Sequence, residues 1–137
     1  GLPLPAGLVM ISPFVDMTLT AASIQAKAKA DPMLSVVPLQ RGVTAYCGDV
    51  LPADPKVSPV FADLEDLPPL FIQVGSDEIL LDDALLLEQR AKAAGVQVSC
   101  TVHEGMWHNF QMFNAFVEKA DKALWAIADF VRRGEQE

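Results

Sequence analysis

The sequence predicts an α/β fold in which about three parallel strands are covered by helices. Three short apolar runs of strand length alternate with segments of helical periodicity, and glycine and proline mark their borders. The 137 residues suit one domain, and a hydrophobic content of 51% argues against disorder. We therefore expect residues 1–137 to form one compact α/β unit.

The three predicted strands cover residues 8–12, 70–74 and 96–103. The first two are continuous apolar runs, which are typical of parallel strands buried on both faces. The third alternates apolar and polar residues and therefore predicts a strand with one exposed face. Each connection between successive parallel strands should cross over with a right hand.

Four helices are expected at residues 21–30, 37–46, 82–94 and 115–133. Thr20 and Asn114 are candidate N-caps for the first and last helices. In the last helix an apolar stripe recurs at spacings of three and four; it consists of Phe116, Ala120, Leu124, Ile127 and Val131.

The third helix has clear signals at both ends. Asp82 and Asp83 suit the positive N-terminal end of a helix, and Gly95 suits its C-terminal cap. The proline-rich segment 50–69 resembles a loop within the domain, because it carries packing residues, namely Val57, Val60, Phe61 and Leu64.

Charge and cysteine content exclude several classes of function. The net charge of −8 is spread along the chain without a Lys/Arg cluster, so nucleic acid is not expected as a partner. Cys47 and Cys100 form no CxxC motif and predict free thiols in a reducing, cytoplasmic setting, although a disulfide between them stays possible.

Residues 1–15 are uncharged but interrupted by three prolines, which argues against a signal peptide or a membrane span. Because the chain starts at Gly1 rather than Met, we expect that start to be a cut and not the natural beginning of the protein.

Asp77 and His108 are the candidate catalytic residues. Each directly follows a predicted strand, and functional groups of α/β sheets gather at the carboxyl ends of strands. A carboxylate that holds an imidazole can support general-base chemistry, and the order acid then histidine matches the last two members of an α/β-hydrolase triad. No G-x-S-x-G nucleophile motif or HGGG loop occurs in the sequence. Taken alone, Asp77 could instead be a turn aspartate, and His108 an ordinary surface histidine.

Residues 67–113 resemble the hormone-sensitive-lipase family of bacterial esterases, with greatest likeness to its esterases and to the monoterpene ε-lactone hydrolase type. The matching segments are Leu67-Pro68-Pro69-Leu70, Gly75-Ser76-Asp77-Glu78-Ile79-Leu80-Leu81-Asp82-Asp83, Gly95-Val96 and Gly105-Met106-Trp107-His108. Upstream, the segments that look like the family are Ile11-Ser12-Pro13-Phe14-Val15-Asp16-Met17-Thr18 and Ala30-Asp31-Pro32-Met33-Leu34.

This resemblance implies the C-terminal part of an α/β-hydrolase fold, lacking the nucleophile-elbow region. It makes Asp77 the triad acid and His108 the triad base of a carboxylic-ester or lactone hydrolase. It implies no metal or organic cofactor. Ile79 and Trp107 are candidate lining residues of the apolar substrate pocket.

Four other chemistries are weaker interpretations. His103 and His108 are five residues apart, whereas the zincin helix needs a spacing of four. Cys100 lies within a predicted strand, which favours an inert thiol over a nucleophile. Ser76 lacks the sharp strand-to-helix elbow of a nucleophilic serine, and Asp82 with Asp83 resemble helix-start acids more than a catalytic pair.

Two functions remain open from the sequence. The first is a serine ester hydrolase by ancestry, acting on a small-molecule ester or lactone, although these 137 residues alone are expected to be inactive. The second is a non-catalytic module or proteolytic remnant that associates through an exposed sheet edge, for which we expect a homodimer.

Overall fold

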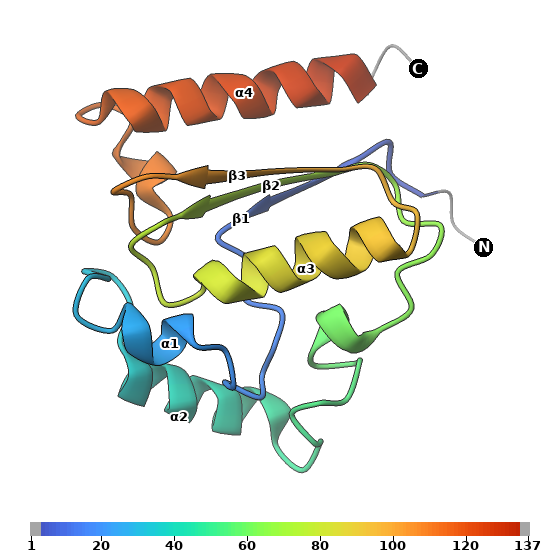
Figure 1. Ribbon diagram of the computed structural model, residues 1–137, viewed down its shortest axis with the longest axis vertical. Helices are drawn as coiled ribbons and strands as arrows, with labels where there is room; N and C mark the ends of the chain where they lie inside the picture. The colour runs from blue at the N-terminus through green and yellow to red at the C-terminus, as the bar shows by residue number, and fades with distance from the viewer. Residues whose placement is uncertain (1–3, 135–137) are drawn as a thin grey trace.

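The computed structural model describes residues 4–134 and has a small parallel sheet at its centre (Figure 1). Within this range the strands are β1 (Leu8–Ile11), β2 (Leu70–Gly75) and β3 (Val98–His103), in the order β1-β2-β3. The α-helices are α1 (Ser23–Ala26), α2 (Val36–Cys47), α3 (Leu81–Ala93) and α4 (Glu118–Gly134). Two short 3-10 helices, η1 (Pro59–Phe61) and η2 (Phe110–Phe113), complete the fold. The predicted α/β class is confirmed.

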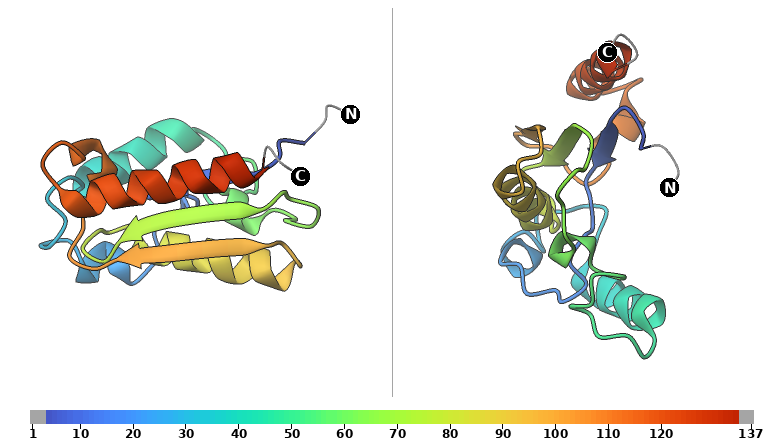
Figure 2. Two further views of the ribbon diagram at one scale, coloured as in Figure 1. Left: turned by 90° about the horizontal axis from the view of Figure 1, so that it is seen from above. Right: turned by 90° about the vertical axis from the view of Figure 1, so that its right-hand side faces the viewer.

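The parallel register brings the carboxyl ends of the strands to one edge of the sheet. Leu70 of β2 lies opposite both Leu8 and Val98, and Gly75 lies opposite His103. Helix α3 covers one face of the sheet and α4 covers the other (Figures 1 and 2). The loops that follow β2 and β3 are therefore neighbours, as the sequence predicted.

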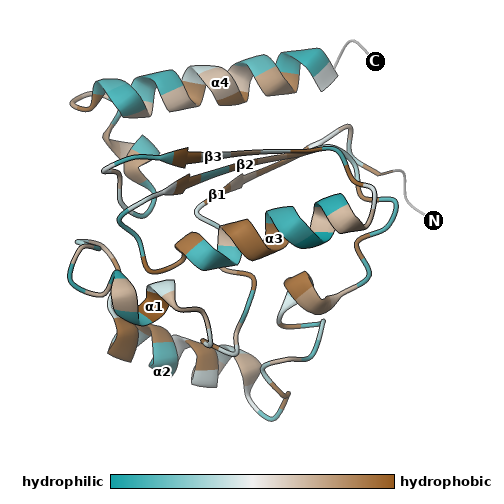
Figure 3. Cartoon of the chain, in the orientation of Figure 1, coloured by the Kyte–Doolittle hydropathy of each residue, from teal (hydrophilic) through white to brown (hydrophobic). Residues whose placement is uncertain are grey.

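The hydrophobic core lies between β2 and α3. All six residues of β2 are buried, because the strand is central in the sheet and covered on both faces. Ile72 and Val74 pack with Ala84, Leu87 and Ala91 of α3. Apolar colouring on the strands and on α3 marks this layer in Figure 3.

One polar residue of β2 anchors the opposite layer. The Gln73 side chain is buried, and its amide nitrogen donates to the carbonyl oxygen of Ala123 in α4 at 2.9 Å. Its amide oxygen accepts a hydrogen bond from Gln111 at 2.9 Å. A buried amide needs such partners, so this pair fixes α4 and η2 against the sheet.

Two predicted helices differ from the structure. The helix expected at residues 21–30 is only the four-residue α1, and its N-cap is Ala22 rather than Thr20. The helix expected from Asn114 begins at Glu118, because η2 precedes it and buries Phe110 against Ala120 and Ala123.

The predicted apolar stripe of the last helix is therefore partly wrong. Phe116 precedes α4 and is 89% exposed, whereas Ala120 is buried. Other predictions are confirmed: Gly95 has a φ of +81° and ends α3, and the apolar residues of the 50–69 loop pack into the protein. No helix in the described part of the chain has the length and apolarity to cross a bilayer.

Candidate active site

The loops after β2 and β3 are joined by backbone hydrogen bonds. The Asp77 amide donates to the Met106 carbonyl at 2.9 Å, and the Ser76 amide donates to the His103 carbonyl at 3.0 Å. Gly75 permits this approach, because a Cβ atom there would lie 2.2 Å from the carbonyl oxygen of Met106. Because Gly75 has no side chain, the loop that carries His108 can pack directly against the end of β2.

His108 is held by the carboxylate of Glu78. Nδ1 of His108 lies 3.0 Å from Oε2 of Glu78, whose side chain is completely buried. Oε1 of Glu78 accepts hydrogen bonds from the Gly75 amide at 2.6 Å and from the Ser12 hydroxyl at 2.8 Å. A carboxylate at Nδ1 selects the tautomer that carries a proton on Nδ1 and a lone pair on Nε2. The Asn109 side-chain amide lies 2.9 Å from that Nε2.

The structure corrects the predicted contact between Asp77 and His108. Oδ1 of Asp77 lies 3.6 Å from Nζ of Lys27, and the Asp77 side chain is 41% exposed. Adjacent residues on this turn point in different directions, so Glu78 faces the imidazole while Asp77 faces solvent and Lys27. The sequence signal for Glu78 was its position beside Asp77, but spacing could not decide between two consecutive acids.

The two predicted pocket residues have different surroundings. The Ile79 side chain is fully buried, and its backbone amide donates to Oδ2 of Asp31 at 3.0 Å. This burial corrects its predicted lining role, because a fully enclosed side chain presents no surface to a substrate. Trp107 is partly exposed and packs edge-on against Phe113 with ring centroids 5.6 Å apart.

The acids at the start of α3 connect it to distant loops. Oδ2 of Asp83 accepts the backbone amides of Val15 and Asp16, each at 3.0 Å. Oδ2 of Asp82 accepts the amide of Ser23 at 2.8 Å. The predicted helix-start position is confirmed, and these carboxylates also tie the loop after β1 and the start of α1 to the first turn of α3.

Burial of Asp83 predicts a pH-dependent stability. Desolvation raises the pKa of Asp83 from 3.8 to about 6, despite the two backbone hydrogen bonds that lower it. The folded state therefore holds the proton of the Asp83 carboxyl more tightly than the unfolded chain does. The resulting contribution to the free energy of unfolding is present below pH 4 and is lost as pH rises through 6. We expect Asp83→Asn to be more stable than wild type at pH 7.5, by up to about 3 kcal/mol, and equal to it near pH 4.

Urea unfolding at both pH values measures this difference. The exposed Asp129→Asn is the matched control, because the Asp129 carboxylate pairs at the surface with Arg132 at 2.9 Å. A pH-independent difference between Asp83→Asn and wild type would contradict the expectation.

The other candidate catalytic groups from the sequence, Cys100, His103 and Ser76, lie in environments that favour a structural role. Cys100 is a free thiol, and burial raises its pKa to about 11, so little thiolate forms near neutral pH. The ring of His103 packs against Phe110 with centroids 4.9 Å apart, and burial lowers its pKa. The Ser76 hydroxyl accepts the amide of Gly105 at 2.8 Å, which is a turn contact.

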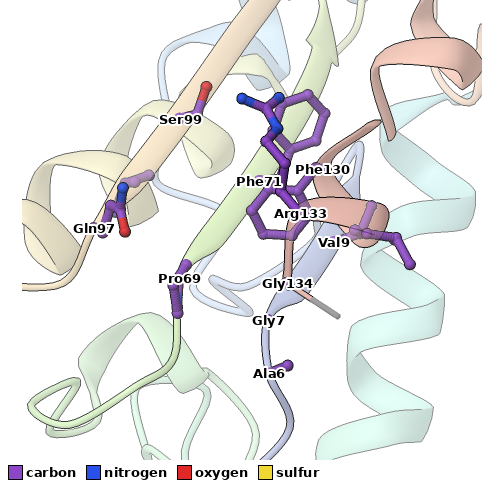
Figure 4. Close-up of a pocket in the computed structure, with 12 residues that line it drawn as sticks. Ala6, Gly7, Val9, Pro69, Phe71, Gln97, Ser99, Phe130, Arg133 and Gly134 are labelled. Carbon is purple, nitrogen blue, oxygen red and sulfur yellow. The ribbon is translucent and has the colours of Figure 1, made fainter. Parts of the chain in front are cut away.

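The described part of the protein contains two sizeable cavities, one beside α4 and one beside α2. One, of about 500 Å³, lies between α4 and the amino ends of the strands, opposite to the Glu78–His108 end, and contains Phe71, Phe130 and Arg133 (Figure 4). The other, of about 640 Å³, lies beside α2 and is lined mostly by apolar side chains, including Phe14, Met17, Met33, Val43 and Tyr46. Only the second borders the loop that follows β1.

The chain is similar to known esterases over nearly its whole length. It is 48% identical to an esterase of Acinetobacter venetianus over 128 residues, which are 93% of this chain and 42% of that protein. It is 36% identical to an acetyl-hydrolase of Streptomyces hygroscopicus over 132 residues, or 96% of this chain and 44% of that protein. The chain thus spans less than half the length of these relatives.

Solved structures agree with this similarity. A hormone-sensitive lipase from a metagenome library superposes with a TM-score of 0.95 at 42% identity, over 98% of this chain and 45% of that chain. The family profile described as alpha/beta hydrolase fold matches residues 1–112. Because that match covers most of the sequence, the chain belongs to the alpha/beta hydrolase fold family, within which it resembles the hormone-sensitive-lipase esterases.

Proposed function

We propose that this chain supplies the acid and the base of a serine ester hydrolase, with Glu78 as the acid and His108 as the base. The observation that carries the proposal is the Glu78–His108 contact of 3.0 Å at the carboxyl end of the sheet. It leaves Nε2 of His108 as a proton acceptor. The nucleophilic serine would come from a region upstream of these residues, as the family resemblance implies.

The proposed reaction is acyl transfer in two steps. Nε2 of His108 accepts the proton of the serine hydroxyl as its oxygen attacks the ester carbonyl, and then gives that proton to the departing alcohol. Water attacks the resulting acyl-enzyme with the same assistance, which releases the acid and regenerates the serine. The Glu78 carboxylate orients His108 and stabilises its imidazolium in both steps.

The substrates we propose are short-chain esters or lactones. The names of the relatives, an esterase and an acetyl-hydrolase, support this class. Trp107, which directly precedes His108, is the proposed lining residue for the hydrocarbon part of such a substrate.

A joined protein tests the function directly. The upstream region of the Acinetobacter venetianus esterase is placed before this chain, and turnover of p-nitrophenyl acetate is measured with and without His108→Ala. We expect the substitution to reduce kcat/KM by at least about 10³-fold, because general-base assistance is lost. Undiminished turnover in the variant would contradict the proposal.

The second candidate function is self-association. In the described part of the chain, β1 pairs with β2 along one side only, and an unpaired strand edge exposes backbone groups that recruit another strand. We propose a homodimer of the 137-residue chain through this edge. Sedimentation equilibrium should give a dimer mass, and a monomer at high concentration would rule this association out.

A further inference from the structure

We propose that Ser12 is a positioning residue for the Glu78–His108 pair. The inference rests on the proposed function, because it concerns how the same pair is held. Ser12 directly follows β1, its side chain is buried at 3% exposure, and its hydroxyl donates to Oε1 of Glu78 at 2.8 Å. The same hydroxyl oxygen accepts the amide of Asn109 at 3.2 Å. One hydroxyl thus binds the acid and the residue next to the base.

The backbone conformation of Ser12 indicates that a serine occupies this position because of its hydroxyl group. Ser12 has a φ of +46° and Asn109 has a φ of +54°, a region that residues other than glycine adopt at a cost. Glycine would adopt the conformation at position 12 more easily. Serine adds only an Oγ and its carbon, and the Oγ makes both hydrogen bonds described above.

The geometry of Glu78 explains what the hydroxyl contributes. The Glu78 side chain is fully buried, so solvent does not stabilise its charge. On Oε1 the donors are Ser12 and the amide of Gly75, and they fix that oxygen while Oε2 faces Nδ1 of His108. Without the Ser12 donor, the Glu78 carboxylate is less well oriented toward Nδ1 of His108. This loss of orientation weakens the stabilisation that Glu78 gives to the imidazolium of His108.

The joined protein described above, assayed with p-nitrophenyl acetate across pH, tests the inference with Ser12→Gly and Ser12→Ala. Glycine keeps the positive φ without the hydroxyl, and alanine loses the hydroxyl while keeping a side chain. We expect both to lower kcat by about 10- to 100-fold with little change in KM, because a hydrogen bond to a charged group is lost. The acid limb of the kcat/KM profile should move to lower pH, because a less well-oriented carboxylate stabilises the imidazolium of His108 less.

Ser58→Ala is the matched control. Ser58 is also a buried serine with two hydrogen bonds, to the Met17 amide at 2.7 Å and the Pro52 carbonyl at 2.6 Å, but it does not contact the pair. It should lower stability without changing kcat or the pH profile. If Ser12→Ala does not fold, Ser12→Gly still tests the positioning role of the hydroxyl.

The outcomes separate the two claims. Wild-type kcat and an unmoved acid limb in Ser12→Gly, while Glu78→Gln is inactive, would overturn the role of Ser12 and leave the proposed function standing. Full activity in Glu78→Gln would overturn both. Loss of kcat with a shifted acid limb in Ser12→Gly, and neither change in Ser58→Ala, supports the positioning role.

Discussion

Glu78→Gln should lower kcat/KM of the joined protein by about 10³- to 10⁴-fold, because the imidazole loses the carboxylate that fixes its tautomer and stabilises its cation. The glutamine keeps the size of the side chain, so the effect comes from the charge. Steady-state turnover of p-nitrophenyl acetate measures it.

Asp77→Asn is the matched comparison, one residue away. Its carboxylate is 41% exposed and lies 3.6 Å from Lys27, so the ion pair contributes little. We expect kcat/KM within about threefold of wild type, since a solvated surface pair does not orient His108. The reverse ranking, with Asp77→Asn inactive and Glu78→Gln active, would return the acid role to Asp77.

Gly75→Ala should be the most damaging substitution outside the pair. The added Cβ would lie 2.2 Å from the carbonyl oxygen of Met106 and 3.0 Å from the amide nitrogen of Trp107, both of which are backbone atoms. The loop must therefore move away, and the move displaces His108. We expect a loss of at least about 3 kcal/mol in the free energy of unfolding, typical of severe overpacking. The same displacement should abolish ester turnover.

Gly42→Ala is the control for this substitution. Gly42 lies inside α2, and a Cβ there meets no atom within 4 Å. Alanine should stabilise the helix by about 0.5–1 kcal/mol and leave turnover unchanged. Denaturant unfolding of both variants measures the contrast. Equal stabilities for Gly75→Ala and wild type would show that the loop does not depend on this contact.

The sequence was sufficient to predict the strand architecture, because the spacing of apolar residues reflects which strand faces are buried. Continuous apolar runs identified β1 and β2, and alternation identified β3. Only β2 is buried along its whole length, because the described residues of β1 are partly buried or exposed at the edge of the sheet. The start of α4 was mispredicted, because burial of Phe110 forms η2 there and no local signal reveals that tertiary contact.

The structure places Glu78, the residue after the predicted Asp77, against His108. The strand ends predicted His108 and Asp77, but which of Asp77 and Glu78 contacts the imidazole depends on side-chain direction in a turn. That direction is set by Gly75 and Ser12, which bind Oε1 of Glu78. Ser12 lies 66 residues from Glu78 in the chain, and a partner at that distance leaves no periodic signal in one sequence.

The contact between Glu78 and His108 can be measured directly by NMR of the joined protein with ¹⁵N-labelled histidine. The Nδ1–H proton of His108 should resonate far downfield in wild type and in Asp77→Asn, because a buried carboxylate accepts it. In Glu78→Gln the resonance should move upfield or be lost to exchange. An unchanged signal in Glu78→Gln, together with a lost signal in Asp77→Asn, would contradict the assignment of Glu78.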